Sequence, residues 1–336
     1  MGRFYGLVFV SIALLYGCSS NDDSPERELT PVTVAVTSFI GEAASFVADE
    51  KGFFKDHGLD VTLRVNDAGS ESVKELLSGD VQIAHIAETP ILFSLLDSTY
   101  FTGAKQGELR IVANMILANK IQKVVARRDA GIETPSDIIG KRVGLAGGTQ
   151  SEYHLDSFLL ENQISISQID TIHMSVATQV EAMINGDIDV AVLWEPQASH
   201  IESILGNNGI ELPTRLTYST LWLAAVLDTF ATEQPETIMN YLKALLQAQF
   251  YIRENPKWAI NLLAERTTVS YEVVADVVSQ IDYELNLSER MLYLLKEQQG
   301  WMVGKGQTSQ PQINVYDLID FQFMEEVRPE GVTLIR

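Results

Sequence analysis

The same short pattern occurs twice in this chain, 107 residues apart. Residues 79–88 hold Gly-Asp, then alanine at 84 and glutamate at 88, and residues 186–195 hold the same four residue types at the same spacing (186 − 79 = 107). The register also includes three apolar residues before each copy, spaced as on one face of a helix. Those residues are Val73, Leu76 and Leu77, matched by Val180, Met183 and Ile184.

Each copy predicts an amphipathic helix, a Gly-Asp turn, a short apolar strand and a glutamate just past the end of that strand. Ligands of open α/β sheets bind outside the carboxyl ends of the strands. Two such ends, marked by Glu88 and Glu195, therefore predict two similar lobes that face each other across a ligand. Chance is the alternative, because Gly-Asp turns before apolar strands are common in α/β proteins.

Length and charge narrow the class of protein. A chain of 336 residues, 46% of them hydrophobic, is long enough for two domains with separate cores. Its 45 acidic residues outnumber the 24 basic ones and give a formal net charge of −21. Binding to phosphates needs a basic face, so nucleic acid is excluded as a partner.

The N-terminal segment has the pattern of a secretion signal. Arg3 precedes an almost purely apolar run, residues 4–16, which would extend about 20 Å as a helix. That run is too short for a bilayer core of about 30 Å, but it suits a signal peptide over residues 1–17. Cys18 is the only cysteine, so no disulfide partner within the chain explains it.

The residues before Cys18 resemble the cleavage box of bacterial lipoproteins, with Leu15 three positions upstream and Gly17 directly before the cysteine. This resemblance implies that Cys18 becomes the lipidated N-terminus, followed by a polar, acidic tether over residues 18–30. Tyr16 is bulkier than this box usually carries, so cleavage by an ordinary signal peptidase is the alternative.

Strands and helices alternate in both halves of the chain. β-rich segments at 32–36 and 61–65, and again at 142–146 and 169–174, are separated by amphipathic stretches. This alternation predicts α/β lobes with parallel sheets and right-handed crossovers.

Two crossings between the lobes are expected. Strands at 111–116 and 124–126 leave the first lobe and enter the second, and an apolar strand within 218–227 returns. Long helices follow from Pro235 onward. The expected division is lobe 1 over residues 31–115 and 226–336, with its C-terminal helices partly in the hinge or lobe 2, and lobe 2 over residues 116–225.

Five stretches in this order are similar to the periplasmic substrate-binding proteins of ABC importers related to the nitrate, alkanesulfonate, taurine and thiamine-precursor binders. They are 46–54 (FVADEKGFF), 76–80 (LLSGD), 140–144 (GKRVG), 191–196 (AVLWEP) and Pro235-Glu236 before a long helix. The resemblance implies a two-lobed periplasmic-binding-protein fold of the type II, flytrap kind. A hinge would let its lobes close on a small ligand.

The resemblance also implies a location and partners. The protein would be a monomeric, membrane-anchored lipoprotein on the periplasmic side or the cell surface. It would deliver a small organic solute, namely a sulfonate, a taurine-like amine or a pyrimidine-like compound, to an ABC permease and its ATPase. A flytrap that reports ligand occupancy to a membrane sensor is the alternative.

Loops at the carboxyl ends of the predicted strands supply the candidate ligand-binding residues. Each lobe offers the loop after its first strand and the residues after its Gly-Asp strand, and two aromatic residues of the second crossing complete the cleft floor. The candidates are Ser38, Phe39, Glu42, Glu88 and Thr89 in lobe 1, Gly148, Thr149, Gln150, Ser151, Trp194 and Glu195 in lobe 2, and Tyr218 and Trp222 at the crossing.

Several candidates have both a functional and a structural interpretation. The loop from Gly147 to Ser151 opens a helix, so its backbone N–H groups can hold an anion such as sulfonate or carboxylate. The structural alternative is a plain helix cap, supplied by Thr149 or Ser151. Trp194 can stack on a ring or an amine of the ligand, or it can pack in the core.

Three glutamates bear on the charge of the ligand. If Glu42, Glu88 and Glu195 all face the cleft, the ligand needs an amine, amidine or heterocyclic N–H donor, because an unpaired buried carboxylate costs several kcal/mol. Pro196 favours an extended Glu195, and in the family this position often contacts the ligand or the hinge. Glu88 can instead cap the helix that begins at Thr89.

Enzymatic chemistry finds no support in the sequence. The G-x-S-x-G, H-E-x-x-H, Walker and dinucleotide-binding motifs do not occur. Cys18 is not available as a nucleophile once it is lipidated, and His85 with Glu88 lacks further histidines at metal-ligand spacing. We therefore expect no catalytic residue, no metal and no cofactor.

Overall fold

The computed structural model describes residues 1–2, 28–97, 101, 108–215, 219–306, 308 and 312–335. The expected signal peptide beyond residue 2, the expected lipidation site Cys18, most of the expected tether and Tyr218 lie outside the described residues. Within the described ranges, no helix combines the length and the apolar character needed to cross a membrane.

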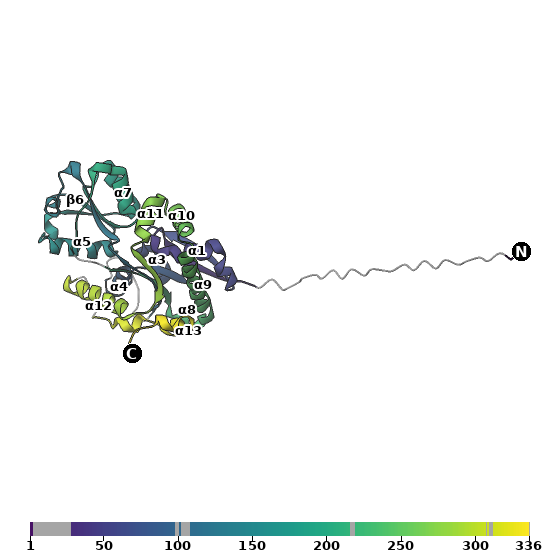
Figure 1. The fold of residues 1–336 in the computed structure, drawn as a ribbon. Helices are drawn as coiled ribbons and strands as arrows, with labels where there is room; N and C mark the ends of the chain where they lie inside the picture. Colours follow the sequence, from purple (N-terminus) through teal and green to yellow (C-terminus); the bar gives the residue numbers. More distant parts are fainter. Residues whose placement is uncertain are drawn as a thin grey trace.

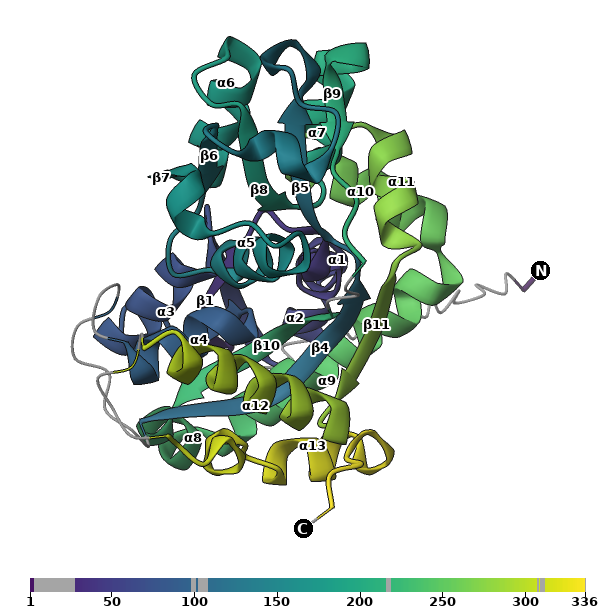
Figure 2. The same cartoon turned by 90° about the vertical axis from the view of Figure 1, so that its left-hand side faces the viewer.

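The molecule consists of two α/β lobes, each built on one sheet (Figures 1 and 2). The strand order of the larger sheet is β11 (Ile281–Asn286), β4 (Leu109–Asn119), β10 (Ser219–Leu227), β3 (Ile83–Ile86), β1 (Thr30–Thr37) and β2 (Leu59–Asn66). The order of the smaller sheet is β7 (Asp170–His173), β6 (Arg142–Leu145), β8 (Val190–Trp194), β5 (Gln122–Arg127) and β9 (Gly209–Glu211).

Helices cover both sheets (Figure 2). Those of the smaller lobe are α5 (Gln150–Glu161), α6 (Val176–Asn185) and α7 (Gln197–Leu205). Those of the larger lobe are α1 (Ala43–Lys51), α2 (Phe53–Asp56), α3 (Gly69–Ser78), α4 (Glu88–Leu96), α8 (Asp228–Glu233), α9 (Pro235–Glu254), α10 (Pro256–Thr267), α11 (Tyr271–Val278), α12 (Glu289–Gly304) and α13 (Gln322–Val327).

The repeated sequence pattern forms the same structural unit in each lobe. Helix α3 ends at Gly79 and helix α6 at Gly186, and both glycines are left-handed, with φ of 80° and 81°. Such a cap favours glycine because a Cβ atom is strained there. In each lobe, the strand after this glycine belongs to a set of three parallel strands: β1 pairs with β2 and β3, and β6 pairs with β7 and β8. The prediction of two equivalent α/β units is confirmed.

Each parallel trio is extended by an antiparallel strand that has just arrived from the other lobe. Strand β5 pairs with β8 in the smaller sheet, and β10 pairs with β3 in the larger one. The chain therefore changes sheets between β4 and β5 and between β9 and β10, not at the expected boundaries 115/116 and 225/226. The reason is the long ladder of β4 with β10, which runs from Asn119 opposite Ser219 to Leu109 opposite Leu227.

Strand β5 shows why the smaller sheet is apolar on both faces. Val124 and Ala126 belong to the core beneath α5, whereas Val125 belongs to the core beneath α6 and α7. Alternate side chains of a strand point to opposite faces, so a sheet covered on both faces needs consecutive apolar residues. The larger lobe holds one continuous core.

Candidate ligand-binding site

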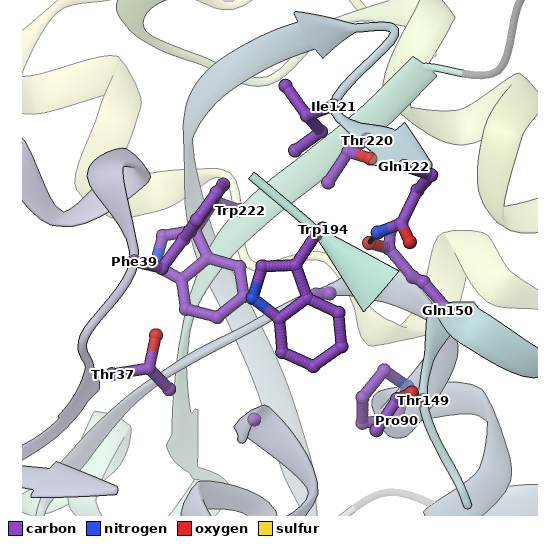
Figure 3. A pocket seen from close by; sticks show the side chains of 12 residues that line it. Thr37, Phe39, Pro90, Ile121, Gln122, Thr149, Gln150, Trp194, Thr220 and Trp222 are labelled. Carbon is purple, nitrogen blue, oxygen red and sulfur yellow. Dashed lines mark hydrogen bonds between the residues drawn. The ribbon is translucent and has the colours of Figure 1, made fainter. Parts of the chain in front are cut away.

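A cavity between the lobes, which we call the inner pocket, is lined by residues from both sheets (Figure 3). The space unfilled by atoms amounts to about 370 Å³ and includes open solvent at its mouth. The larger lobe contributes Thr37, Phe39, Gly69, Ala87, Pro90, Thr220 and Trp222. The first crossing and the smaller lobe contribute Ile121, Gln122, Thr149, Gln150 and Trp194.

Aromatic rings form one side of the inner pocket. The ring of Phe39, just after β1, meets that of Trp222 on β10 edge to face, with the centroids 5.0 Å apart. Trp194, the last residue of β8, lies between this pair and the amides of Gln122 and Gln150 (Figure 3). Such rings offer a large apolar contact area to the organic part of a ligand.

Three helices begin at the inner pocket. Gly69 is the first residue of α3, Ala87 precedes α4, and Thr149 is the N-cap of α5. The first turn of a helix carries a partial positive charge and backbone N–H groups without intrahelical partners, which together attract anions. None of the described residues that line the pocket has a charged side chain. The first turns of these helices also carry Glu71, Glu88 and Glu152, whose charges offset part of the dipoles. An anion in the pocket would therefore depend on backbone N–H groups, amides and hydroxyl groups, without an ion pair.

Three polar atoms of the pocket wall, Thr37 Oγ1, Thr220 Oγ1 and Gln122 Oε1, find no hydrogen-bond partner among the described residues. All three side chains are buried. A buried polar atom without a partner costs about 1–3 kcal/mol. A ligand that accepts from the two threonine hydroxyls and donates to the glutamine oxygen would remove this cost.

The structure brings five of the thirteen candidate residues to the inner pocket, namely Phe39, Thr149, Gln150, Trp194 and Trp222. Ser38 lines a neighbouring hollow. Gly148 and Ser151 are buried beside Thr149 without lining the inner pocket. Thr149 also has the capping role, because its Oγ1 accepts from the backbone N–H of Ser151 at 3.2 Å.

Glu42 is fully buried behind the pocket wall. Its Oε1 accepts from the indole N–H of Trp222 at 2.9 Å and from the backbone N–H of Thr37 at 3.3 Å. Its Oε2 accepts from Ser45 Oγ at 3.1 Å and lies 2.6 Å from His85 Nδ1. Glu42 therefore positions two pocket residues, and its own carboxylate is already bonded within the protein.

Glu88 is the first residue of α4, at the favourable end of the helix dipole. Its Oε2 accepts from the backbone N–H of Leu221 at 3.0 Å, and its Oε1 accepts from Gln298 Nε2 at 2.7 Å. Thr89 does not line the pocket, since its hydroxyl donates to Gln298 Oε1 at 2.5 Å. Both side chains connect α4 to the neighbouring elements β10 and α12.

Glu195 is only 3% exposed and does not line the inner pocket. Its two oxygens accept from the backbone N–H and the hydroxyl of Ser199, at 3.0 and 2.9 Å, and burial raises the pKa of the carboxyl. The peptide bond between Glu195 and Pro196 is cis. Ligand contact by Glu42, Glu88 and Glu195 stays a prediction: protein donors bond to the oxygens of all three, and none of them lines the inner pocket.

The candidate set omitted seven lining residues, Thr37, Gly69, Ala87, Pro90, Ile121, Gln122 and Thr220. The rule of strand carboxyl ends, applied also to β2, would have found Gly69 at the start of the next helix. Thr37 is the last residue of β1, one position before the candidate loop. Gln122 and Thr220 lie on strands whose register is set by pairing with distant segments, so no local signal marks them.

Known proteins share this architecture. A taurine-binding periplasmic protein of Escherichia coli (strain K12) is 27% identical over 237 residues, which is 69% of either chain. The alkanesulfonate-binding protein SsuA from Xanthomonas axonopodis pv. citri, bound to MOPS, superposes with a TM-score of 0.74 at 15% identity, over 88% of this chain and 99% of that one. The desulfurization enzyme DSZB superposes with a TM-score of 0.67 at 15% identity, over 90% and 99%. The structural likenesses confirm the two-lobed periplasmic-binding-protein fold.

A family profile described as NMT1/THI5 like matches residues 41–259. The match begins in the loop after β1 and ends in α10, so it includes both crossings between the lobes. Because this match spans more than half of the sequence, the chain belongs to the NMT1/THI5-like family.

Proposed function

We propose that this protein captures a small organosulfonate between its lobes and delivers it to a membrane importer. The observation that carries the proposal is the convergence of three helix N-termini on a pocket without a charged lining residue. Such a site suits a compact anion with delocalised charge, because several N–H groups can share it without a cation.

The rest of the pocket wall favours an organic substituent on the anion. Phe39, Trp194 and Trp222 supply apolar contact, and Gln122 Oε1 can accept from an amine, amide or hydroxyl group of the ligand. Nitrate lacks an organic part, and a neutral pyrimidine-like compound lacks the anion. The names of the taurine-binding and alkanesulfonate-binding proteins support the same chemical class.

The location and partners in this proposal follow from the family resemblance and from the N-terminal sequence. The chain is a monomeric lipoprotein, anchored through Cys18 on the outer side of a membrane, that passes its ligand to an ABC permease and its ATPase. The periplasmic location named for the taurine-binding relative supports an extracytoplasmic site.

Binding without covalent chemistry fits the inner pocket. Its described lining offers no carboxylate, imidazole, amine or thiol to act as acid, base or nucleophile. Nor do the described ranges contain a group of three or more His, Cys, Asp or Glu side chains able to hold a metal ion. The likeness to the enzyme DSZB concerns the fold and transfers no reaction to this chain.

Calorimetric titration with ethanesulfonate, nitrate and a pyrimidine tests the proposal. We expect ethanesulfonate to bind and the other two to bind at least about tenfold more weakly, a difference of about 1.4 kcal/mol. Trp194→Ala should lower the affinity for ethanesulfonate by a similar factor, because it removes one face of the pocket. Trp258→Ala, which changes a half-buried tryptophan on α10 outside the pocket, is the matched control. Tight pyrimidine binding without sulfonate binding would overturn the proposal.

A further inference from the structure

A second hollow adjoins the inner pocket, and we call it the outer compartment. Its space unfilled by atoms amounts to about 630 Å³ and includes open solvent. Thr37 and Trp194 line both spaces, so the inner pocket and the outer compartment share a wall. A ligand that occupies both spaces would have to pass between or beside these two side chains.

The wall of the outer compartment is mixed and more polar than that of the inner pocket, with Val176, Ala177 and Trp194 as its apolar part. Its lining includes the side chains of Ser38, Asp67, Gln197, Arg266 and Thr268. One acidic and one basic residue face it, together with hydroxyl and amide groups that both donate and accept. This combination suits a hydrophilic substituent better than an alkyl chain.

Both lobes contribute to the outer compartment. Ser38 and Asp67 follow strands β1 and β2 of the larger lobe, and Arg266 lies in the last turn of α10. Ala177 and Gln197, in the first turns of α6 and α7, come from the smaller lobe. A ligand group held here would contact both lobes and would therefore favour their closed arrangement.

Hydrogen-bonding capacity in the outer compartment is unused. Thr37 is 3% exposed, and its Oγ1 has no partner among the described residues. Gln197 Oε1 is buried and equally unpartnered within the described part of the chain. Both ion pairs of Arg266, with Asp49 and Glu50, use Nη2, so the remaining guanidinium N–H groups can donate elsewhere.

We propose that the outer compartment is a second ligand subsite, which takes a polar, hydrogen-bonding substituent of the same molecule whose sulfonate occupies the inner pocket. The inference rests on the proposed function and specifies its substrate class: a sulfonate with an amide or hydroxyl group on its organic part. Gln197 Oε1 accepts from the N–H or O–H of that group, and Arg266 donates to its oxygen.

A matched pair of sulfonates tests the inference. N-acetyltaurine and hexanesulfonate carry organic parts of six non-hydrogen atoms, one with an amide and one without. Calorimetric titration should show that N-acetyltaurine binds at least about tenfold more tightly than hexanesulfonate, because only its amide can donate to a buried acceptor. Ethanesulfonate, which is too short for a distal group, reports on the inner pocket alone.

Gln197→Leu keeps the approximate size of the side chain and removes its acceptor. We expect this change to reduce the preference for N-acetyltaurine to less than about threefold and to leave ethanesulfonate binding unchanged. Gln312→Leu, at an exposed position outside both cavities, is the control. If Gln197→Leu does not fold, the Ala177→Phe variant tests the second subsite instead. It fills the outer compartment from an exposed position on α6, and it should weaken both longer sulfonates but not ethanesulfonate.

The outcomes separate the two proposals. Binding of ethanesulfonate without a preference for N-acetyltaurine over hexanesulfonate would overturn the second subsite and leave the proposed function standing. A preference that survives both Gln197→Leu and Ala177→Phe would overturn the second subsite as well. Absence of binding by all three sulfonates would overturn the proposed function and the subsite together.

Discussion

At the scale of single residues, a buried chain of hydrogen bonds supports the inner pocket. It runs from the indole of Trp222 to Glu42, from Glu42 to His85 at 2.6 Å, and from His85 Nε2 to the hydroxyl of Tyr241 at 3.0 Å. All four side chains are at most 5% exposed. Every bond in this chain has one donor and one acceptor if the Tyr241 hydroxyl donates to His85 Nε2 and the His85 Nδ1–H donates to the Glu42 carboxylate. The Trp222 ring, which lines the inner pocket, is thus fixed from the core of the larger lobe.

Glu42→Gln tests this support. The substitution replaces one carboxylate oxygen with an amide NH₂. The groups around position 42 are donors, including the Trp222 indole and the Thr37 backbone N–H, so a buried donor loses its acceptor. We expect the free energy of unfolding, measured in urea, to fall by about 2–4 kcal/mol and ethanesulfonate binding to weaken. Glu133→Gln is the control, because Glu133 is 64% exposed in its pair with Arg128 and should change stability by less than about 1 kcal/mol. Equal effects of both substitutions would contradict the role of Glu42.

The sequence singled out these glutamates but could not identify their partners. Glu42 bonds to a side chain 180 positions away, and Glu88 to one 210 positions away. A strand-end rule places a residue at the edge of a sheet without showing which distant donors meet it there. Trp194 and Thr149 could be predicted because their positions depend only on the local strand and helix that carry them.

A buried histidine gives the protein a predicted pH dependence. Burial, followed by the charge of Lys123, lowers the pKa of His154 to about 4, and the side chain is 4% exposed. The unfolded chain takes up this proton near pH 6.5, whereas the folded chain does not. Stability conferred by the neutral imidazole is therefore present above about pH 6.5 and is lost as the pH falls towards 4.

Urea titrations of the wild type and His154→Leu at pH 7 and pH 4.5 measure this contribution. The wild type should lose about 2–3 kcal/mol more of its free energy of unfolding between these pH values than the variant does. His173→Leu, at an exposed position on β7, should behave as the wild type. Equal pH dependence of the wild type and His154→Leu would exclude His154 as the cause.

At the scale of elements, the duplicated unit of helix, glycine, strand and glutamate was predictable from the sequence. Its helices, glycine turns and strands follow from local periodicity and from the backbone that glycine permits. The lobe boundaries were not predictable to the residue, because β4 and β10 continue in the larger sheet through a ladder between segments about 100 residues apart. Cross-strand pairing of this kind leaves no periodic signal in either strand.

The two equivalent helix caps should respond alike to substitution. Gly79→Ala and Gly186→Ala each place a Cβ at a left-handed residue, and no atom lies closer than 3.6 Å to the added group. We therefore expect only conformational strain, about 1–2 kcal/mol for each, in thermal or urea unfolding. Gly300→Ala inside α12, where the added Cβ meets nothing within 4 Å, should instead be neutral or stabilising. A loss at only one of the two caps would contradict their equivalence.

At the scale of the whole molecule, the two lobes also contact each other outside the inner pocket. The hydroxyl of Tyr153 on α5 donates to Glu297 on α12 at 3.0 Å, and the indole of Trp301 on α12 donates to Asp156 on α5 at 2.9 Å. The rings of Tyr153 and Trp301 pack edge to face. The N-terminus of α5 lies at the inner pocket, so this contact and the ligand would hold the same helix.

The central claim is that a sulfonate binds between the lobes in the inner pocket. A crystal structure of the complex with ethanesulfonate, in which anomalous scattering locates the sulfur, tests it most directly. We expect the sulfur in the inner pocket, between Trp194, Trp222 and the start of α5. A well-defined complex with the sulfur anywhere else on the protein would contradict it.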